Sequence, residues 1–214
     1  MNANLEKTTL DTKKLTLTII FAAIAITLNP TLTHLSVPAP FDPGLFYQLW
    51  EIPIVIALLI ISPLSSIIVC LLNTSVLLIL FPGALPTGPL YNMLACISMQ
   101  IGIHATITLG KKVHTHKTPQ TNILTSIKWL TATTGIGILT RVSFMTIIHY
   151  FALPQPPPIG FGLNEVITSA FLPLSALFNA TLALYTIPTG WIIAHQVQKV
   201  LQLTMSKNNN ITKQ

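Results

Sequence analysis

Four polar side chains stand inside long uncharged stretches of this sequence, and they are the ones most suited to binding. Arg141 is the only arginine, and Asn73, Gln100 and Asn179 carry amides. A polar group at membrane depth is costly unless it has a partner, and it often marks a substrate or ion site. A rise of about 1.5 Å per residue from the expected helix ends places all four about 12 to 21 Å below one membrane surface. We therefore predict a polar layer near the middle of a helix bundle.

Arg141 has two possible roles within that layer. It could hold helices together through backbone carbonyls and Asn179, or it could contact a carbonyl or anionic group of a bound ligand. Glu165 is expected at a helix end about 18 Å away from Arg141 in depth, which is beyond the reach of one side chain. A direct ion pair between these two residues is therefore not expected.

Motifs for catalysis or for resident cofactors are missing from the sequence. It contains no HExxH zinc motif, no G-x-S-x-G nucleophile elbow and no phosphate-binding P-loop. Cys70 and Cys96 form no CxxC pair and lie in apolar segments, so we interpret both as small packing residues. We predict a protein that is not an enzyme and holds no metal or cofactor.

Composition fixes the class of elements that must position the polar residues. The chain has 214 residues, of which 51% are hydrophobic and 7% charged, whereas soluble domains average about 25% charged residues. A soluble domain and a disordered chain are both excluded. Proline and glycine clusters at Ser62-Pro63 and Phe81 to Pro89 divide the longest apolar run. We predict an all-α integral membrane bundle of six helices, at Leu15–Thr33, Tyr47–Ile61, Leu64–Phe81, Leu90–Gly110, Lys128–Leu153 and Glu165–Lys199.

The lysines predict how this bundle is oriented. Alternating six helices across a membrane puts every lysine on one side, namely Lys7, Lys13, Lys14, Lys111, Lys112, Lys117, Lys128, Lys199, Lys207 and Lys213. The opposite side carries Asp42, Glu51 and Glu165. Because cytoplasmic loops carry the excess of lysine and arginine, we predict a multi-pass protein of the cell membrane with both termini in the cytoplasm. Residues 1–14 and 200–214 are then cytoplasmic segments flanking a transmembrane domain of residues 15–199. The net charge of +6 suits anionic lipid, and no nucleic acid is expected.

Three short motifs in the first half of the chain occur in a familiar order. Leu49-Trp50-Glu51-Ile52-Pro53 is followed by Ser62-Pro63 with Asn73 downstream, and then by Gly88-Pro89-Leu90-Tyr91-Asn92. This order resembles the substrate-binding S components of energy-coupling-factor (ECF) vitamin transporters, the riboflavin-type branch in particular. Two positions depart from that pattern: Ser62 replaces the usual glycine, and Leu72 stands where riboflavin binders often have lysine.

The resemblance implies a vitamin receptor of an importer that is powered by a separate membrane coupling subunit and two cytoplasmic ATPases. A small aromatic vitamin, riboflavin or a similar one, would bind under the first outward loop. Trp50 and Tyr91 are then candidates for stacking, although both could instead anchor the protein at the lipid interface. The candidates for hydrogen bonding are Glu51, Asn73, Asn92, Arg141 and Asn164.

The family docks its coupling subunit on a small-residue face of the first helix, for which Ala22, Ala23 and Ala25 are the candidates. Two other functions stay open. The chain could be a structural subunit of a larger membrane complex, or a lipid-modifying enzyme with Glu51, His34 and His149 at the membrane surface.

Overall fold

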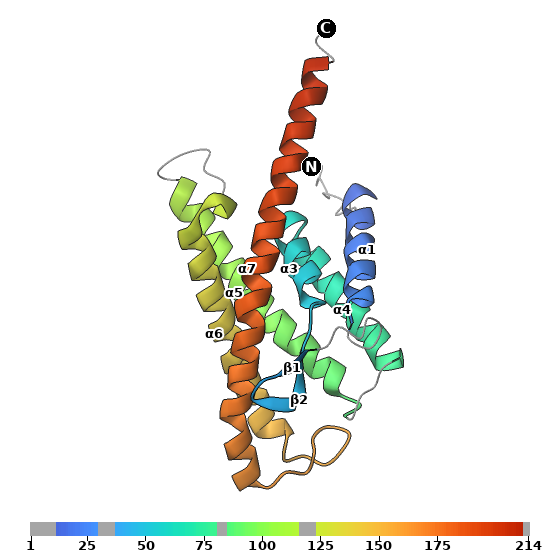
Figure 1. Cartoon of the computed structure of the whole chain (residues 1–214), viewed down its shortest axis with the longest axis vertical. Helices are drawn as coiled ribbons and strands as arrows, with labels where there is room; N and C mark the ends of the chain where they lie inside the picture. The colour runs from blue at the N-terminus through green and yellow to red at the C-terminus, as the bar shows by residue number, and fades with distance from the viewer. Residues whose placement is uncertain (1–11, 30–36, 81–84, 116–122, 212–214) are drawn as a thin grey trace, which may run out of the picture.

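The computed structural model describes residues 12–29, 37–80, 85–115 and 123–211, and within them it contains the six predicted α-helices and one β-hairpin. The elements are α1 (Thr12–Thr27), β1 (Val37–Ala39), β2 (Asp42–Tyr47), α3 (Glu51–Ile60), α4 (Pro63–Leu80), α5 (Gly88–Thr115), a short 3₁₀ turn η1 (Ile123–Thr125), α6 (Ile127–Ala152) and α7 (Glu165–Ile211). Figure 1 shows the helices as one elongated bundle with the hairpin against its lower half.

Helix bounds differ most from the prediction at three ends. Helix α1 ends at Thr27 instead of Thr33, and α5 continues to Thr115 into the predicted loop. Helix α7 passes its predicted end at Lys199 and continues to Ile211. It also continues through Pro173 and Pro188, which membrane helices tolerate because neighbouring groups satisfy the carbonyls that proline leaves without a partner.

A hairpin and a short connecting segment occupy the place of the predicted first turn of the second helix. Strands β1 and β2 pair antiparallel, with Val37 opposite Tyr47 and Pro38 opposite Phe46. Directly after the turn, the Asp42 carboxylate at the start of β2 accepts a hydrogen bond from the Gly44 N–H at 2.8 Å. Helix α3 therefore starts only at Glu51 and has 10 residues.

Because α3 is so short, it rises only about 15 Å. It occupies the half of the bundle farther from the hairpin (Figure 1). The short segment between the hairpin and α3 leads into the bundle, where Glu51 is the first residue of α3. Helix α3 contacts α1 and α4 on one side and α7 on the other, and α7 continues the series through α6 to α5. The short helix thus joins the two halves of the bundle.

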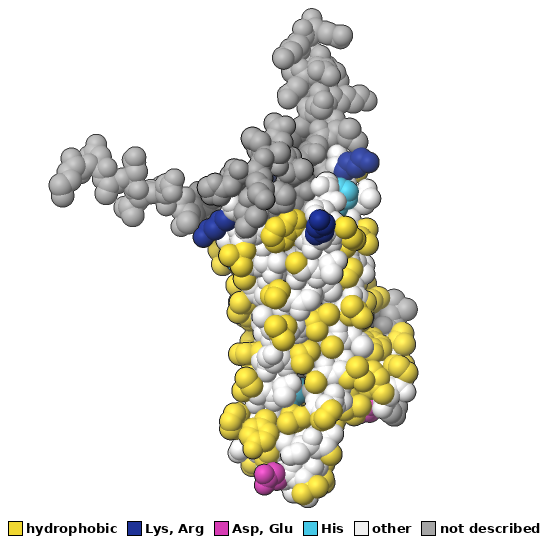
Figure 2. Space-filling model, turned by 90° about the vertical axis from the view of Figure 1, so that its left-hand side faces the viewer, with side chains coloured by type: hydrophobic (Ala, Val, Ile, Leu, Met, Phe, Trp, Pro, Cys, Tyr) yellow, Lys and Arg dark blue, Asp and Glu magenta, His cyan; other side chains and the backbone are white. Residues whose placement is uncertain are grey.

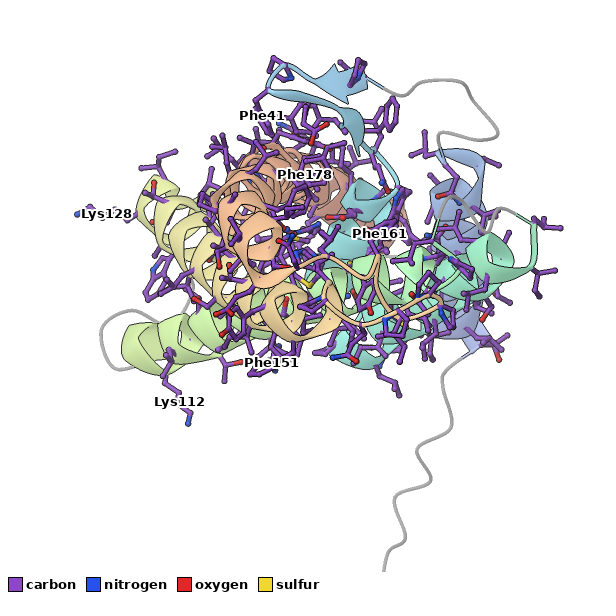
Figure 3. The ribbon with its side chains drawn as sticks, turned by 90° about the horizontal axis from the view of Figure 1, so that it is seen from below. Phe41, Lys112, Lys128, Phe151, Phe161 and Phe178 are labelled. Atoms are coloured by element: carbon purple, nitrogen blue, oxygen red, sulfur yellow. The ribbon has the colours of Figure 1, made fainter. Side chains whose placement is uncertain are left out.

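The surface of the bundle has the polarity of a membrane protein. Among the residues that the structure describes, four helices are long and apolar enough to cross a membrane: α4, most of α5, α6 and the first 36 residues of α7. Hydrophobic side chains cover the length of the face in Figure 2, with basic side chains at its upper end and acidic ones low on it. We call the upper end, where α1 begins, α5 ends and α6 begins, the lysine end, and the other the hairpin end. Viewed from the hairpin end, Lys112 and Lys128 point outward from the bundle (Figure 3).

Small residues allow the helices to approach closely. A Cβ added at Gly190 of α7 would lie 2.7 Å from Val55 Cγ1 of α3, and one added at Gly137 of α6 would lie 2.5 Å from Ile187 Cδ1 of α7. Glycine at these positions lets the backbones pack without a side chain between them. The Ser62 hydroxyl accepts a hydrogen bond from the Ser65 N–H at 3.1 Å and so caps α4, with Pro63 as its first residue.

Candidate functional site

A buried ion pair joins the middle of α6 to the start of α3. Arg141 donates from Nη1 to Glu51 Oε2 at 2.5 Å and from Nη2 to Glu51 Oε1 at 2.9 Å. The two side chains are only 1% and 2% exposed. This two-point geometry matches the planar guanidinium to the carboxylate and makes the strongest kind of side-chain hydrogen bond. The carboxylate that satisfies Arg141 is therefore part of this chain.

The prediction that placed Glu51 with the surface acids opposite the lysines was wrong. A full-length second helix would have begun at the membrane surface, but α3 begins inside the bundle because the hairpin precedes it. Arg141 lies about 16 Å from the hairpin end of α6 and about 21 Å from its lysine end, by helical rise. Its partner must therefore also lie near the middle of the bundle.

Asn179 of α7 and Met99 of α5 are further partners of Arg141, with Met99 Sδ 3.7 Å from Nη1. Arg141 Nε donates to Asn179 Oδ1 at 3.0 Å, which confirms the predicted structural contact. Asn179 Nδ2 donates to the Ser175 carbonyl at 2.9 Å, and the Ser175 hydroxyl lies 2.5 Å from His149 Nδ1. The pair is thus the inner end of a polar chain that runs toward the hairpin end between α6 and α7.

Tyr91 of α5 continues this polar chain to the loop that joins α6 and α7. Its ring meets His149 edge-on, with ring centroids 6.2 Å apart. Its hydroxyl donates to the Ile159 carbonyl at 2.5 Å, and the neighbouring Thr87 hydroxyl donates to the Pro158 carbonyl at 2.5 Å. The half-buried Tyr91 thus connects the start of α5 to the α6–α7 loop. Stacking of a ligand on its ring stays a prediction.

The other side of the site is the junction between the hairpin and α7. The Tyr185 hydroxyl donates to the Gln48 carbonyl at 2.6 Å and accepts from the Gln48 N–H at 3.1 Å. Tyr47 stacks on Phe178 with centroids 5.7 Å apart, and its hydroxyl donates to Thr181 Oγ1 at 3.1 Å. Tyr47 and Gln48, which precede Glu51 in the chain, therefore hold this segment against α7.

Trp50 lies inside this junction. It is fully buried in the main core cluster with Ile54 and Val55, and its indole N–H donates to the Gln48 side-chain oxygen. A fully buried ring in this chain cannot be an anchor at the lipid interface, which was one of the two predicted roles. Trp50 directly precedes Glu51 and anchors this segment in the core.

Two further candidates lie near the hairpin end. Asn92 is half-buried in α5 beside Tyr91. Asn164 is exposed, and its side-chain oxygen accepts a hydrogen bond from the Ile167 N–H at 2.9 Å. Asn164 is thus the N-cap of α7, a structural role that was not predicted, and its role in ligand binding stays a prediction.

The predicted polar layer consists of separate contacts. Asn73 accepts a hydrogen bond from Asn29 Nδ2 at 2.9 Å, between α4 and the end of α1. Gln100 accepts one from the Ser66 hydroxyl at 2.6 Å, between α5 and α4. Neither contact joins the Arg141 cluster, because each amide finds a partner on a different helix pair. Asn73 therefore holds α1 to α4.

The predicted docking face of α1 is divided. Ala22 and Ala25 are buried and belong to the chain's own core cluster. Ala23 is exposed. Within the described helix, Ala23 is the one of these three alanines that a partner helix could reach.

Sequence reasoning missed most of the polar side chains that surround the ion pair. Tyr47 and Gln48 lie in a segment predicted as helix, where they had no distinct role. Tyr185 is an isolated tyrosine within an apolar helix. Its polar hydroxyl was the available signal that it needs a partner, which the structure shows to be Gln48. Ser175 carried no signal, since serine is common in membrane helices.

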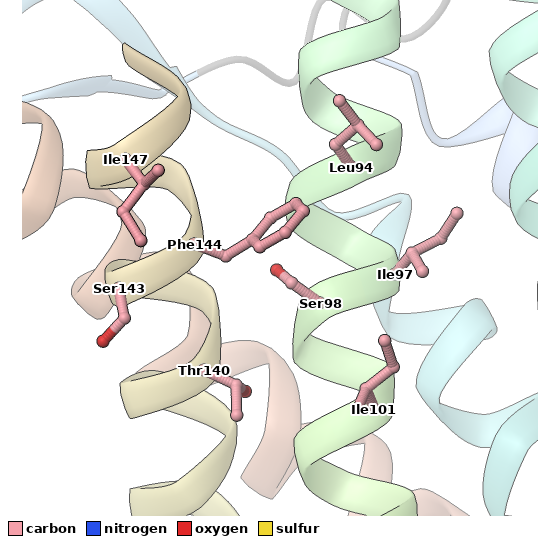
Figure 4. A pocket seen from close by; sticks show the side chains of 8 residues that line it. All are labelled: Leu94, Ile97, Ser98, Ile101, Thr140, Ser143, Phe144 and Ile147. Carbon is pink, nitrogen blue, oxygen red and sulfur yellow. The ribbon is translucent and has the colours of Figure 1, made fainter. Parts of the chain in front are cut away.

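Two apolar grooves lie on the outside of α5. One, of 320 Å³, is lined by side chains of α5 and α6, and Figure 4 shows Phe144 of α6 pointing across it toward Ser98 of α5. Its walls include the exposed side chains of Ile101 and Ile147. The other, of 260 Å³, lies between α5 and the helices α3 and α4. Apolar side chains make up most of both linings.

The described residues contain no group of three or more His, Cys, Asp or Glu side chains placed to hold a metal ion. Cys70 and Cys96 are both buried and free, which confirms them as packing residues.

Comparison with known proteins identifies the fold. The chain is similar to a solved structure described as "Structure and mechanism of the S component of a bacterial ECF transporter", with a TM-score of 0.65. The two are 23% identical, and the match covers 89% of this chain and 98% of that one. No protein-family model matches the sequence, and no curated protein matches it. This chain therefore is a multi-pass membrane protein with the S-component fold.

Proposed function

We propose that this chain is the substrate-binding subunit of an ECF-type vitamin importer. The observation that carries the proposal is the structural match, which extends over nearly the whole length of both chains. The order of the motifs around Glu51, Ser62 and Asn92 supports the same function independently of the structure.

The substrate would enter from the hairpin end. The lysines of the described helices gather at the other end, which favours a cytoplasmic location for the lysine end and for both termini. The polar chain from Tyr91 through His149 to Arg141 runs inward from the hairpin end. A ligand descending along it would meet aromatic and hydrogen-bonding side chains first and the ion pair last.

A small aromatic vitamin of the riboflavin kind suits this arrangement. Tyr91 offers a half-buried ring and Asn92 an adjacent amide near the entrance. Below them, Glu51 and Arg141 supply hydrogen-bonding atoms at the floor of the site. Trp50 would act indirectly, because its packing in the core holds Glu51 in position.

Energy for transport would come from other chains. The sequence contains no P-loop, so ATP hydrolysis would belong to two cytoplasmic ATPases joined to a membrane coupling subunit. The coupling subunit would meet α1 at Ala23, where a small exposed side chain allows close approach of a partner helix.

Native mass spectrometry of the detergent-purified chain tests this function. We expect a small molecule bound at one copy per chain, and fluorescence of the released ligand identifies it if it is a flavin. Thermal unfolding with added vitamins is measured in parallel, and the bound vitamin should raise the midpoint. An empty protein that no vitamin stabilises would favour a structural subunit of a larger complex.

A further inference from the structure

We infer that the part of the substrate that reaches the floor of the site is uncharged. This inference rests on the proposed function and deepens it, because it names the class of substrate that the ion pair admits. It follows from the way in which Glu51 and Arg141 neutralise each other.

Both charges at the floor are already matched. Arg141 directs two nitrogens to the two oxygens of Glu51 and its third, Nε, to Asn179. The carboxylate of Glu51 meets the guanidinium with both of its oxygens at hydrogen-bonding distance. Each group thus directs its hydrogen-bonding edge toward the other, and the pair carries no net charge.

No lysine or arginine other than Arg141 could receive an anionic ligand inside the bundle. Arg141 is the only lysine or arginine between residues 15 and 110 and between residues 129 and 198. An anionic group would therefore have to take Arg141 from Glu51. That exchange would strand a buried carboxylate beside the new anion, and like charges in such a site repel strongly.

A cationic group meets the same obstacle with the signs reversed. It would have to take Glu51 from Arg141 and leave the guanidinium with the Asn179 oxygen and the weakly accepting Met99 sulfur. An uncharged ring requires neither exchange, because amide, imide and carbonyl groups can share the remaining lone pairs and N–H groups of the intact pair. The ion pair therefore selects against ligands with a fixed charge at the buried end.

Matched ligand pairs test this selection on the full-length protein in detergent. The probes are riboflavin against riboflavin 5′-phosphate, nicotinamide against nicotinate, biotinamide against biotin, and thiochrome against thiamine. The measurement is the rise in the thermal unfolding midpoint, followed by titration calorimetry for each pair that shows a shift. We expect the uncharged member of the responding pair to bind at least 10-fold more tightly.

The outcomes separate the two proposals. An ionised member that binds as tightly as its uncharged partner, or more tightly, overturns the inference and leaves the proposed function in place. Stabilisation by no member, in a protein that also purifies empty, overturns the proposed function and the inference with it.

Two variants assign the selection to the ion pair. Glu51→Gln keeps the side-chain shape but frees the charge of Arg141, so the preference should move toward the anionic member by at least 10-fold. Glu165→Gln removes an exposed acid at the same end and should keep the preference of the unmodified protein. An equal change in both variants would overturn the assignment. If Glu51→Gln fails to fold, the ligand pairs measured on the unmodified protein still decide whether the site prefers the uncharged ligand.

Discussion

Removing one partner of the Glu51–Arg141 pair should destabilise the protein far more than removing both. The side chains are 1% and 2% exposed, so either charge left alone would stay in the low-dielectric interior. Breaking a buried pair in this way costs about 3 to 5 kcal/mol. We expect a loss of that size for Arg141→Met, which leaves the Glu51 carboxylate without its cation, and for Glu51→Leu, which leaves the guanidinium with only the uncharged acceptors of Asn179 and Met99.

The double variant should recover most of this loss. Replacing both members of a buried pair with apolar residues of similar volume is often neutral or stabilising. Arg141→Met combined with Glu51→Leu should therefore be more stable than either single variant by about 2 kcal/mol or more.

The assay is unfolding of the purified chain in mixed micelles of dodecyl maltoside with rising dodecyl sulfate, followed by tryptophan fluorescence. All four proteins of the cycle are measured under the same conditions without ligand. A double variant no more stable than its less stable single variant would refute the reasoning, since the two charges would then not depend on each other. Single variants within about 1 kcal/mol of the unmodified protein would refute it as well, because that cost is typical of exposed pairs.

Two further predictions concern the contacts that hold the site in position. Tyr185→Phe removes the hydroxyl that bonds both backbone groups of Gln48, so hydrogen exchange in the hairpin should quicken about 5- to 30-fold, equivalent to about 1 to 2 kcal/mol. Gly190→Ala places a Cβ at 2.7 Å from Val55 Cγ1 and should cost about 1 to 3 kcal/mol in the unfolding assay by separating α7 from α3.

Each of these predictions has a matched control. Tyr150→Phe alters an exposed tyrosine of α6 and should leave hairpin exchange unchanged. Gly135→Ala adds a Cβ that would meet no described atom within 4 Å, and it should be neutral or stabilise α6 by up to about 1 kcal/mol. Hairpin exchange that stays the same in Tyr185→Phe would show that the hydroxyl does not fasten the hairpin. Equal stability of the two glycine variants would show that the close approach at Gly190 is not needed.

The sequence determined the class and the layout of this protein. A charged fraction of 7% in a chain that is 51% hydrophobic leaves a helical membrane bundle as the stable arrangement, because backbone groups in hydrocarbon must bond within helices. Proline and glycine clusters predicted most helix boundaries to within a few residues. They do so because a helix starts or ends at local capping residues, as at Ser62 and Pro63. The gathering of lysines at one end of the described helices also followed from the sequence, since charge is read directly from residue order.

The tertiary structure decided which polar groups meet. Arg141 could be recognised as a buried charge that needs a partner, but its partner is 90 residues away in the chain. Glu51 reached it only because a hairpin shortens α3, and the hairpin depends on pairing of β1 with β2 and on the contacts of Tyr47 and Gln48 with α7. Such contacts are long-range and leave little trace in local propensity. Periodicity and composition describe each helix by itself, whereas the ion pair arises from the three-dimensional packing of α3, α6 and α7.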